Sequence, residues 1–434
     1  KYMDLNDQQK LAISVLQGPV LVTAAAGTGK THVLINRFEA LVASGVNPHN
    51  ILCLTFSNQA AQEMIDRINV QEKGLWIGTF HGICYRFLQM VGKINNTTSI
   101  VDEYDQRKIF TQLNIQQYAN EINRYRELGN TSIAPNNIKQ ALKIYEKFLE
   151  ENNLIDFSNM LLLAMEEIKN GNSFPNMFEY IMVDEYQDTN VVQEEFIQLL
   201  LKNHNNIFCV GDDDQCIYIW RGANIKNILT FSSRYPKSNV FKLEQNYRST
   251  KEILNTAYSV ISKNFDRLDK KGWSNRSGEK VYVICAKNES QFIASTIKKL
   301  SGTVGILVRS SKQIQDIEEA LIQNSIKYNV VNGNKLLNKS EIKAIIYYLQ
   351  TIVNKDKFAL FNIINIPKRG IGPKKTEQLD QLINSGIDIF DAVKEINLDL
   401  GNLFERWHNL RYDKNIVNII GKESGLFDTF TKQQ

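Results

Sequence analysis

Near the start of the chain, two closely spaced glycines are followed by a lysine and a threonine: the stretch 21–32 reads Leu-Val-Thr-Ala-Ala-Ala-Gly-Thr-Gly-Lys-Thr-His. Small residues let backbone N–H groups wrap a phosphate, and a helix that begins there adds partial positive charge. Lys30 would reach the β- and γ-phosphates of a nucleotide, and the Thr31 hydroxyl would ligate Mg²⁺. Ala24 stands where such a loop usually begins with glycine, and it is small enough. The predicted nucleotide-binding loop therefore comprises Ala24, Ala25, Ala26, Gly27, Thr28, Gly29, Lys30, Thr31 and His32.

Two acidic residues follow a second apolar run, at 180–183, and open the sequence Asp-Glu-Tyr-Gln-Asp-Thr-Asn. Acidic residues at the end of a strand that faces a phosphate loop can bind Mg²⁺ or position the attacking water in nucleotide hydrolysis. We expect Asp184 to hold Mg²⁺, directly or through water, and Glu185 to orient and deprotonate the attacking water. A solvated acidic turn is the alternative interpretation.

A third apolar run, at 207–210, ends in Gly-Asp-Asp-Asp-Gln. The amide of Gln215 can hydrogen-bond a γ-phosphate and so report its presence. Three consecutive carboxylates repel one another unless a cation is near, and we expect Mg²⁺ or Lys30 to be that cation.

Three further residues are candidates for nucleotide contact. The amide of Gln9, shortly before the phosphate loop, has a donor and an acceptor suited to the edge of adenine, although a surface glutamine is the ordinary interpretation. After an apolar run at 240–243, Tyr247 offers a ring face for adenine. Arg248 is a fixed fork of donors suited to a phosphate in its transition state.

Aromatic and polar side chains also follow the strand predicted at 51–56 and the one that ends near residue 79. Rings beside hydroxyls and amides suit the stacked bases and phosphate oxygens of single-stranded nucleic acid, whereas core packing is the alternative for a ring such as Phe56. More large rings lie next to Gln215. The candidate DNA-binding residues are Thr55, Phe56, Asn58, Thr79, His81, Tyr218, Trp220 and Arg221.

The apolar runs read as short buried strands, and the stretches between them as helices, which predicts an α/β fold with ligands at the carboxyl ends of parallel strands. Residues 5–9 open a helix with Asn6 or Asp7 as its N-cap, and Ser57-Asn58 begins another. Between 91 and 173 charged helical patterns dominate, at 102–113, 138–152 and 157–168, and we interpret this region as a helical insertion.

The composition fits a globular protein: 434 residues, 43% hydrophobic, 23% charged and a formal net charge of +4. That charge neither demands nor excludes nucleic acid, so a DNA groove would need local clustering of cations. The five cysteines form no Cys-x-x-Cys pair, which favours reduced thiols. No run of eighteen apolar residues and no signal-peptide pattern occur, so we expect a cytoplasmic protein without a membrane partner.

These motifs, in this order, resemble those of the UvrD/Rep/PcrA family of superfamily 1 DNA helicases. The matching segments are 5–9, 24–31, 55–58, 78–82, 184–190, 211–223 and 246–249, followed by 328–333, 339–343 and 365–372. The resemblance implies two RecA-like P-loop NTPase motor lobes with parallel sheets and helical insertion subdomains. It implies a first lobe at 1–90 and 174–241, the insertion at 91–173, a second lobe at 242–372, and the start of a helical subdomain at 373–434.

The resemblance also implies an ATP-dependent DNA helicase that uses ATP and Mg²⁺, binds single-stranded and partly duplex DNA, and moves 3′ to 5′. Lys30, Asp184, Glu185, Gln215 and Arg248 would be its catalytic residues, and Arg248 an arginine finger from the second lobe. Gln9 and Tyr247 match the family's adenine-reading positions. Phe56, Tyr218 and Trp220 match the rings between which bases are stacked and passed. A protein partner, such as a nuclease or a repair or defence factor, is compatible with this family but is not identifiable from the sequence.

Two features depart from the family pattern. His32 stands where relatives commonly carry arginine, and a neutral imidazole would weaken one nucleotide contact. The family's Gly-Leu-Glu segment and its second arginine finger have no counterpart, so we expect an incomplete second lobe that is truncated, uncovered or completed by a partner. A competing hypothesis is an ATP-binding switch or partner subunit without processive unwinding. The complete ATPase set opposes it, because binding alone would not need Glu185. An RNA helicase fits the sequence around 184–188 less well.

Overall fold

The computed structural model describes residues 5–70, 72–95, 97–219, 222–310, 312–331 and 340–431. It divides into two compact units, Lys1–Val281 and Tyr282–Gln434, and each is described by itself. The predicted boundary between lobes at 241/242 falls inside a strand of the first unit, at 239–243.

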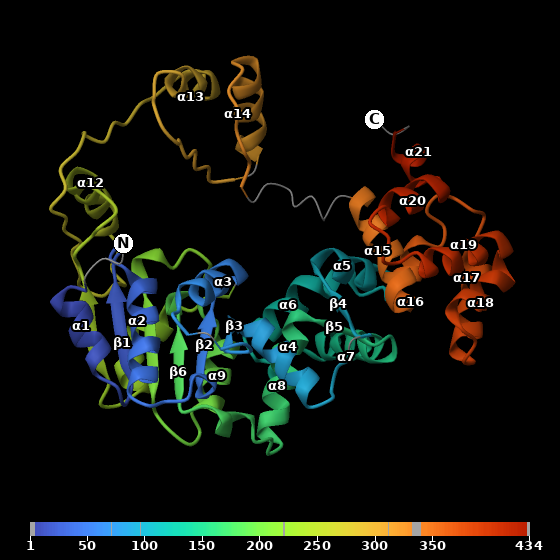
Figure 1. The fold of residues 1–434 in the computed structure, drawn as a ribbon, viewed down its shortest axis with the longest axis horizontal. Coiled ribbons are helices and arrows are strands. Elements are labelled where there is room, and N and C mark those ends of the chain that lie inside the picture. The colour runs from blue at the N-terminus through green and yellow to red at the C-terminus, as the bar shows by residue number, and fades with distance from the viewer. Residues whose placement is uncertain are drawn as a thin grey trace. The chain divides into compact units, whose positions relative to one another are not determined.

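The first unit is built on a six-stranded sheet in the order β3-β2-β6-β7-β1-β8, with every pair of neighbours parallel (Figure 1). The predicted apolar runs form these strands, so the α/β class with a parallel sheet is confirmed. The strands are β1 (Val20–Ala24), β2 (Ile51–Thr55), β3 (Trp76–Thr79), β6 (Tyr180–Val183), β7 (Ile207–Gly211) and β8 (Asn239–Leu243).

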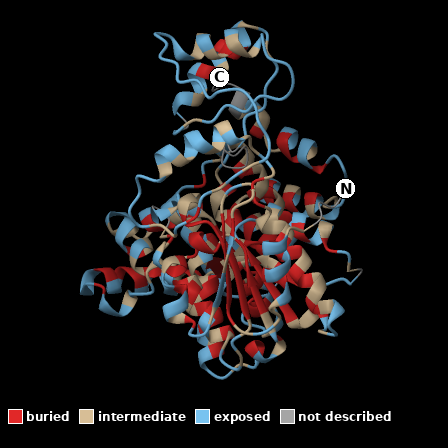
Figure 2. Cartoon of the chain, turned by 90° about the vertical axis from the view of Figure 1, so that its left-hand side faces the viewer, coloured by how far each residue is buried: buried red, intermediate tan, exposed pale blue. Residues whose placement is uncertain are grey.

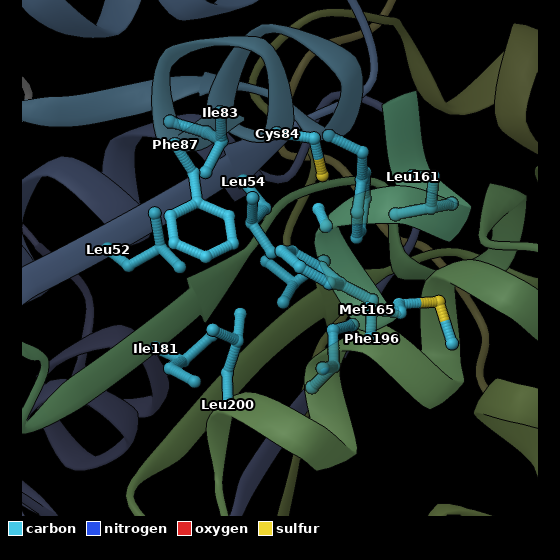
Figure 3. Close-up of a cluster of buried hydrophobic side chains, with 14 of the residues drawn as sticks. Leu52, Leu54, Ile83, Cys84, Phe87, Leu161, Met165, Ile181, Phe196 and Leu200 are labelled. Atoms are coloured by element: carbon cyan, nitrogen blue, oxygen red, sulfur yellow. The ribbon is translucent and has the colours of Figure 1, made fainter. Parts of the chain in front are cut away.

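Helices cover both faces of this sheet, because alternate residues of each buried strand point to opposite faces. Leu52, Leu54 and Ile181 pack against helices α4, α8 and α9 (Figure 3). Val20, Val22 and their neighbours pack against α1, α2 and α3 on the other face. Figure 2 shows the strands as the buried centre of this unit. Its helices are α1 (Asp7–Ser14), α2 (Lys30–Ala43), α3 (Asn58–Arg67), α4 (Phe80–Met90), α9 (Val191–Leu200), α10 (Lys226–Leu229), α11 (Phe231–Arg234) and α12 (Lys251–Ile261).

Side-chain caps set where the helices at the carboxyl edge begin. The Asn6 side chain accepts from the Gln9 amide while the Gln9 side chain accepts from the Asn6 amide, which makes a capping box at α1. Ser57 caps α3 and Thr79 caps α4 more simply, because in each case the hydroxyl oxygen accepts one hydrogen bond from a backbone amide of the helix. The predicted helix starts at Asn6 and Ser57 are thus confirmed.

The segment 91–173 is mainly helical, as predicted, with one short parallel pair of strands, β4 (Ser99–Val101) and β5 (Leu154–Asp156). A fully buried Arg126 donates to both oxygens of Asp156, each at 2.7 Å. Burial opposes ionisation of Asp156, but the charge and hydrogen bonds of Arg126 outweigh it and lower its pKa. The helices are α5 (Glu103–Gln112), α6 (Ala119–Glu127), α7 (Asn136–Glu151) and α8 (Phe157–Lys169), and α8 completes the core under the large sheet.

Within the described residues of the second unit, the regular elements are helices joined by irregular segments, and a core is centred on Tyr348, Phe404 and Trp407. The second parallel sheet expected for the second lobe has no counterpart in the described ranges 282–310, 312–331 and 340–431. The predicted motif residues 332, 333 and 339 lie outside the described residues. The helices are α13 (Glu289–Ile297), α14 (Lys312–Gln323), α15 (Ser340–Asn354), α16 (Lys357–Ile363), α17 (Pro373–Asn384), α18 (Ile389–Ile396), α19 (Leu398–Asn409), α20 (Ile416–Glu423) and α21 (Leu426–Thr431).

Short 3₁₀ turns connect several elements: η1 (Pro48–Asn50), η2 (Gln116–Tyr118), η3 (Thr131–Ile133), η4 (Phe174–Met177), η5 (Tyr186–Asp188) and η6 (Asp213–Gln215). All five cysteines are free thiols, and Cys53, Cys84 and Cys209 are buried, as expected. Within the described residues, no helix combines the length and apolar character that a membrane crossing needs.

Candidate functional site

The carboxyl ends of the six parallel strands meet at one edge of the sheet, and the predicted nucleotide residues follow four of them. The phosphate loop follows β1, the acids follow β6, the sensor loop follows β7, and the segment 244–248 follows β8. The predicted DNA residues of β2 and β3 continue the same edge, where Thr55 and Thr79 are register partners. Parallel topology alone therefore brings together motifs that are far apart in the sequence.

The phosphate loop is a tight turn between β1 and α2. Gly27 and Gly29 have positive φ angles of 75° and 90°, a conformation that favours glycine, and Gly29 is the residue before the first turn of α2. The Thr28 hydroxyl donates to the Ala25 carbonyl at 2.7 Å. Lys30 begins the helix with a side chain that is 10% exposed. The loop has the shape and helix terminus that bind a phosphate.

Residues from two distant segments brace this loop. The Gln9 amide donates to the Thr28 carbonyl at 3.0 Å, and Asn6 donates to the Tyr247 hydroxyl at 2.9 Å. The Tyr247 backbone amide donates to the Gly27 carbonyl at 2.9 Å, and the Asn246 side chain donates to the Ala26 carbonyl. Gln9 and Tyr247, which are both predicted to contact the nucleotide, thus lie beside the phosphate loop.

Arg248 also lies against the phosphate loop. A side chain at Gly27 would come within 2.8 Å of the Arg248 Cβ, so the two backbones are in close contact. The Arg248 side chain is exposed. The contact belongs to the first unit, whereas the sequence interpretation places this arginine in the second lobe.

The two acids after β6 face the loop lysine. Glu185 has a positive φ of 48°, and its Oε2 lies 3.2 Å from Lys30 Nζ. Asp184 is 5% exposed, and its pKa is raised to about 7, first by burial and then by the charge of Glu185, with Lys30 acting in the opposite direction. The pKa of Asp188 is raised to about 7 for the same reasons. This edge of the sheet therefore carries more negative charge than Lys30 alone balances.

The residues present fit a magnesium ion that is bound together with a nucleotide. The described residues contain no group of three or more His, Cys, Asp or Glu side chains arranged to hold a metal. Magnesium sites in nucleotide enzymes take one or two protein oxygens, several waters and the substrate phosphates. Thr31 in the first turn of α2 and Asp184 at the end of β6 supply that kind of ligand set. Asp188 Oδ1, which is buried without a hydrogen-bond partner, is a further oxygen that fits this ligand set.

The three carboxylates of the sensor loop are neutralised by residues that the sequence interpretation missed. Lys270, 2% exposed, pairs with Asp212 at 2.9 Å, with Asp214 at 3.2 Å, and with Asp213. Arg267 donates twice to Asp214, at 3.0 and 2.8 Å. Of the two cations expected here, Mg²⁺ or Lys30, Lys30 is not the partner, because it pairs with Glu185. The signal for Lys270 is weak in the sequence, since it reads as one of two ordinary surface lysines.

Charge balance at this cluster is visible in the pKa of Lys270. Burial opposes the charge of the ammonium group, but Asp212 and Asp213 outweigh it and raise its pKa. Gln215, at the end of η6, donates to the Asp212 carboxylate. The predicted γ-phosphate sensor thus belongs to a loop that a buried lysine holds in place.

The predicted DNA residues form a partly exposed surface next to the nucleotide edge. Phe56, 39% exposed, stacks on Tyr218 with ring centroids 5.0 Å apart and an interplanar angle of 24°. Asn58 is exposed, whereas Thr55 is buried and its hydroxyl donates to the Ser57 carbonyl at 3.1 Å.

His81 packs edge-to-face on Phe157 at 5.4 Å, and burial lowers its pKa, with Asp156 acting in the opposite direction. It is therefore neutral near pH 7, and it cannot attract phosphates as a cation. Thr79 caps α4. Trp220 and Arg221 lie outside the described residues.

Comparisons with known proteins give concordant matches along the chain. The UvrD/REP helicase N-terminal domain matches residues 5–140 and 114–236, and the UvrD-like helicase C-terminal domain matches 241–428. A probable DNA helicase II homolog of Rickettsia felis is 35% identical, with 99% of this chain and 75% of the relative covered. Its counterpart in Rickettsia conorii is 36% identical, with 92% and 68% covered. The ATP-dependent DNA helicase PcrA of Staphylococcus aureus is 34% identical over 90% of this chain and 60% of its own length.

The buried lysine of the sensor loop allows a direct test of its role. Replacing Lys270 by methionine leaves Arg267 as the one cation paired with the three carboxylates among the described residues, and breaking a buried ion pair in this way costs about 3–5 kcal/mol. We expect a loss of that size in the free energy of unfolding of the first unit, measured by urea titration. The adjacent exposed Lys271→Met is the control, expected to cost less than about 1 kcal/mol. Equal urea midpoints for the two variants would show that the sensor loop does not need this lysine.

Proposed function

The chain belongs to the UvrD/Rep helicase family, and we propose that it is an ATP-dependent DNA helicase that couples ATP hydrolysis to movement along single-stranded DNA. The observation that carries the proposal is the meeting of a phosphate loop, a lysine–glutamate pair and a sensor glutamine at one edge of a parallel sheet. A stacked pair of aromatic rings, of which Phe56 is 39% exposed, continues that edge.

In this proposal the loop residues bind ATP without large rearrangement. The backbone amides of 25–31 and the N-terminus of α2 would receive the phosphates. Gln9 and Tyr247, which already lie against the loop, would contact the adenine. Lys30 would leave Glu185 for the β- and γ-phosphates, which have the greater negative charge. The same step would free Glu185 to act as a base.

Hydrolysis would then depend on five positioned side chains. Glu185 would accept a proton from the attacking water, a role that contributes about 10²–10⁴-fold in rate. Thr31 and Asp184 would hold Mg²⁺, which neutralises charge on the phosphate oxygens when it is bound. Gln215 would contact the γ-phosphate, and Arg248 would stabilise charge in the transition state.

The base assignment predicts a separation of binding from turnover. Glu185→Gln removes the proton acceptor but keeps the size and polarity of the side chain. We expect ATP binding, measured with a fluorescent nucleotide, within about threefold of wild type, and steady-state hydrolysis reduced by about 10²–10⁴-fold. The control is Glu195→Gln, at a side chain that is 44% exposed and pairs with Lys169, and it should hydrolyse ATP normally. Full turnover by Glu185→Gln would exclude this role, and wild-type binding without turnover would favour a nucleotide switch.

For DNA, we propose that the Phe56–Tyr218 pair opens to stack a base. The rings are close enough to exclude solvent from their shared face, yet Phe56 is more exposed than a core residue. Thr79 and Asn58 would then lie along the strand as polar contacts. Trp220 and Arg221 remain predicted contacts of the same surface.

Removing the stacking ring should weaken DNA binding more than ATP binding. Phe56→Ala is expected to lose about 1–3 kcal/mol of affinity for oligo-dT, which is roughly 5- to 150-fold in Kd. Fluorescence anisotropy at one fixed salt concentration measures this loss. The control is Phe265→Ala, since that ring is 99% exposed. A Kd for oligo-dT unchanged by Phe56→Ala, with weaker ATP binding, would make the ring a packing residue.

We further propose movement from 3′ to 5′, supported by the resemblance of the motifs to the UvrD/Rep/PcrA family. The polarity predicts unwinding of a duplex that carries a 3′ single-stranded tail, with little unwinding of a 5′-tailed duplex of the same sequence. Strand separation of the two substrates, each with ATP and Mg²⁺, measures this directly. Preferential unwinding of the 5′-tailed duplex would refute the polarity.

A further inference from the structure

Gln187 is a buried amide that lies between the acidic loop and the sensor loop and has no role in the mechanism above. It belongs to the short turn η5 and is 1% exposed. A buried amide is costly unless its donor and acceptor are both satisfied, so its partners indicate what it does.

The two ends of the Gln187 amide bind different loops. Its Nε2 donates to Glu185 Oε2 at 2.9 Å, and its Oε1 accepts from the Asp212 backbone amide at 2.8 Å. The fit is tight, because a Cβ on Gly211 would stand only 2.7 Å from Gln187 Oε1. The side chain therefore fixes the distance between Glu185 and the start of the sensor loop.

Gln187 and Lys30 hold the same oxygen of Glu185. Lys30 Nζ lies 3.2 Å from Oε2, the atom that Gln187 also contacts. Oε1 has no hydrogen-bond partner among the described residues, so it is available to a water. When Lys30 moves to the phosphates, Gln187 is the side chain that still fixes the orientation of Glu185.

The contact also links Glu185 to the γ-phosphate sensor. Asp212, whose amide binds Gln187, accepts a hydrogen bond from the Gln215 side chain through its carboxylate. Lys270 pairs with the same carboxylate. A displacement of Gln215 toward a phosphate would thus act on Glu185 through only two intervening residues.

We propose that Gln187 is a positioning residue that holds Glu185 in its catalytic orientation and connects it to the sensor loop. The proposal rests on the proposed function, in which Glu185 is the base. It predicts that Gln187 affects the rate of hydrolysis and leaves nucleotide binding nearly unchanged.

Two variants test this with different effects on packing. Gln187→Met keeps the approximate volume and removes the hydrogen bonds to Glu185, Asp188 and the Asp212 amide, whereas Gly211→Ala keeps the amide and pushes its Oε1 aside. We expect kcat for ATP to fall about 10- to 100-fold in each, as for residues that orient a catalytic group. The KM for ATP and the Kd for a fluorescent nucleotide should stay within about threefold of wild type.

A second buried amide provides the matched control. Asn227 is 1% exposed and donates to the Thr189 carbonyl at 3.0 Å, near the same segment but without contact to Glu185. Asn227→Leu should lower the melting temperature about as much as Gln187→Met and leave kcat close to wild type. Equal losses of kcat in these two variants would mean that Gln187 is only a structural residue.

The Glu185→Gln background separates this proposal from the proposed function. If Gln187 acts through Glu185, then Gln187→Met should cause no further loss of the residual rate in that background, since coupled residues are not additive. The same fold-loss in both backgrounds, or wild-type kcat for Gln187→Met, would overturn the positioning role and leave the base assignment intact. Full activity of Glu185→Gln alone would instead overturn the base assignment.

Discussion

Parallel pairing of six strands is the constraint on which the site depends. Because every strand of the sheet runs in the same direction, every carboxyl end emerges at one edge. Residues as far apart in the chain as Gln9, Glu185 and Tyr247 meet there, and a hydrogen bond from Asn6 to Tyr247 joins two of their segments directly. The buried apolar faces of the strands hold this arrangement, and the helices on both sides exclude water from it.

Charge is the second constraint, and it separates two groups of acids at that edge. Among the described residues, Asp184, Glu185 and Asp188 lie near Lys30, and burial, followed by the charge of Glu185, raises the pKa of both aspartates. Asp212, Asp213 and Asp214 are balanced by Lys270 and Arg267. The first group is therefore suited to a cation that arrives with a nucleotide, whereas the second is already neutralised by the protein and can serve to hold a loop. Gln187 connects the two groups.

Much of this could be predicted from the sequence, because short apolar runs that end in glycine or acids identify strands and their loops. Asn6 and Ser57 were identifiable as helix caps, since their side chains act within three residues. The partners Lys270 and Gln187 were not. Lys270 lies far along the chain from its acids, in a stretch without periodic pattern, and Gln187 is a polar residue whose two contacts exist only after folding. Local rules specify the elements, whereas contacts between distant loops depend on tertiary packing.

We propose that one edge of the sheet serves both ATP and DNA. Steady-state ATPase of the chain, measured with and without single-stranded DNA at one salt concentration, tests it most directly. Without DNA, the chain should hydrolyse ATP slowly. With increasing single-stranded DNA, the rate of hydrolysis should rise clearly and then saturate. The same rate of hydrolysis at every DNA concentration would contradict it, because the aromatic surface would then be unconnected to the nucleotide site.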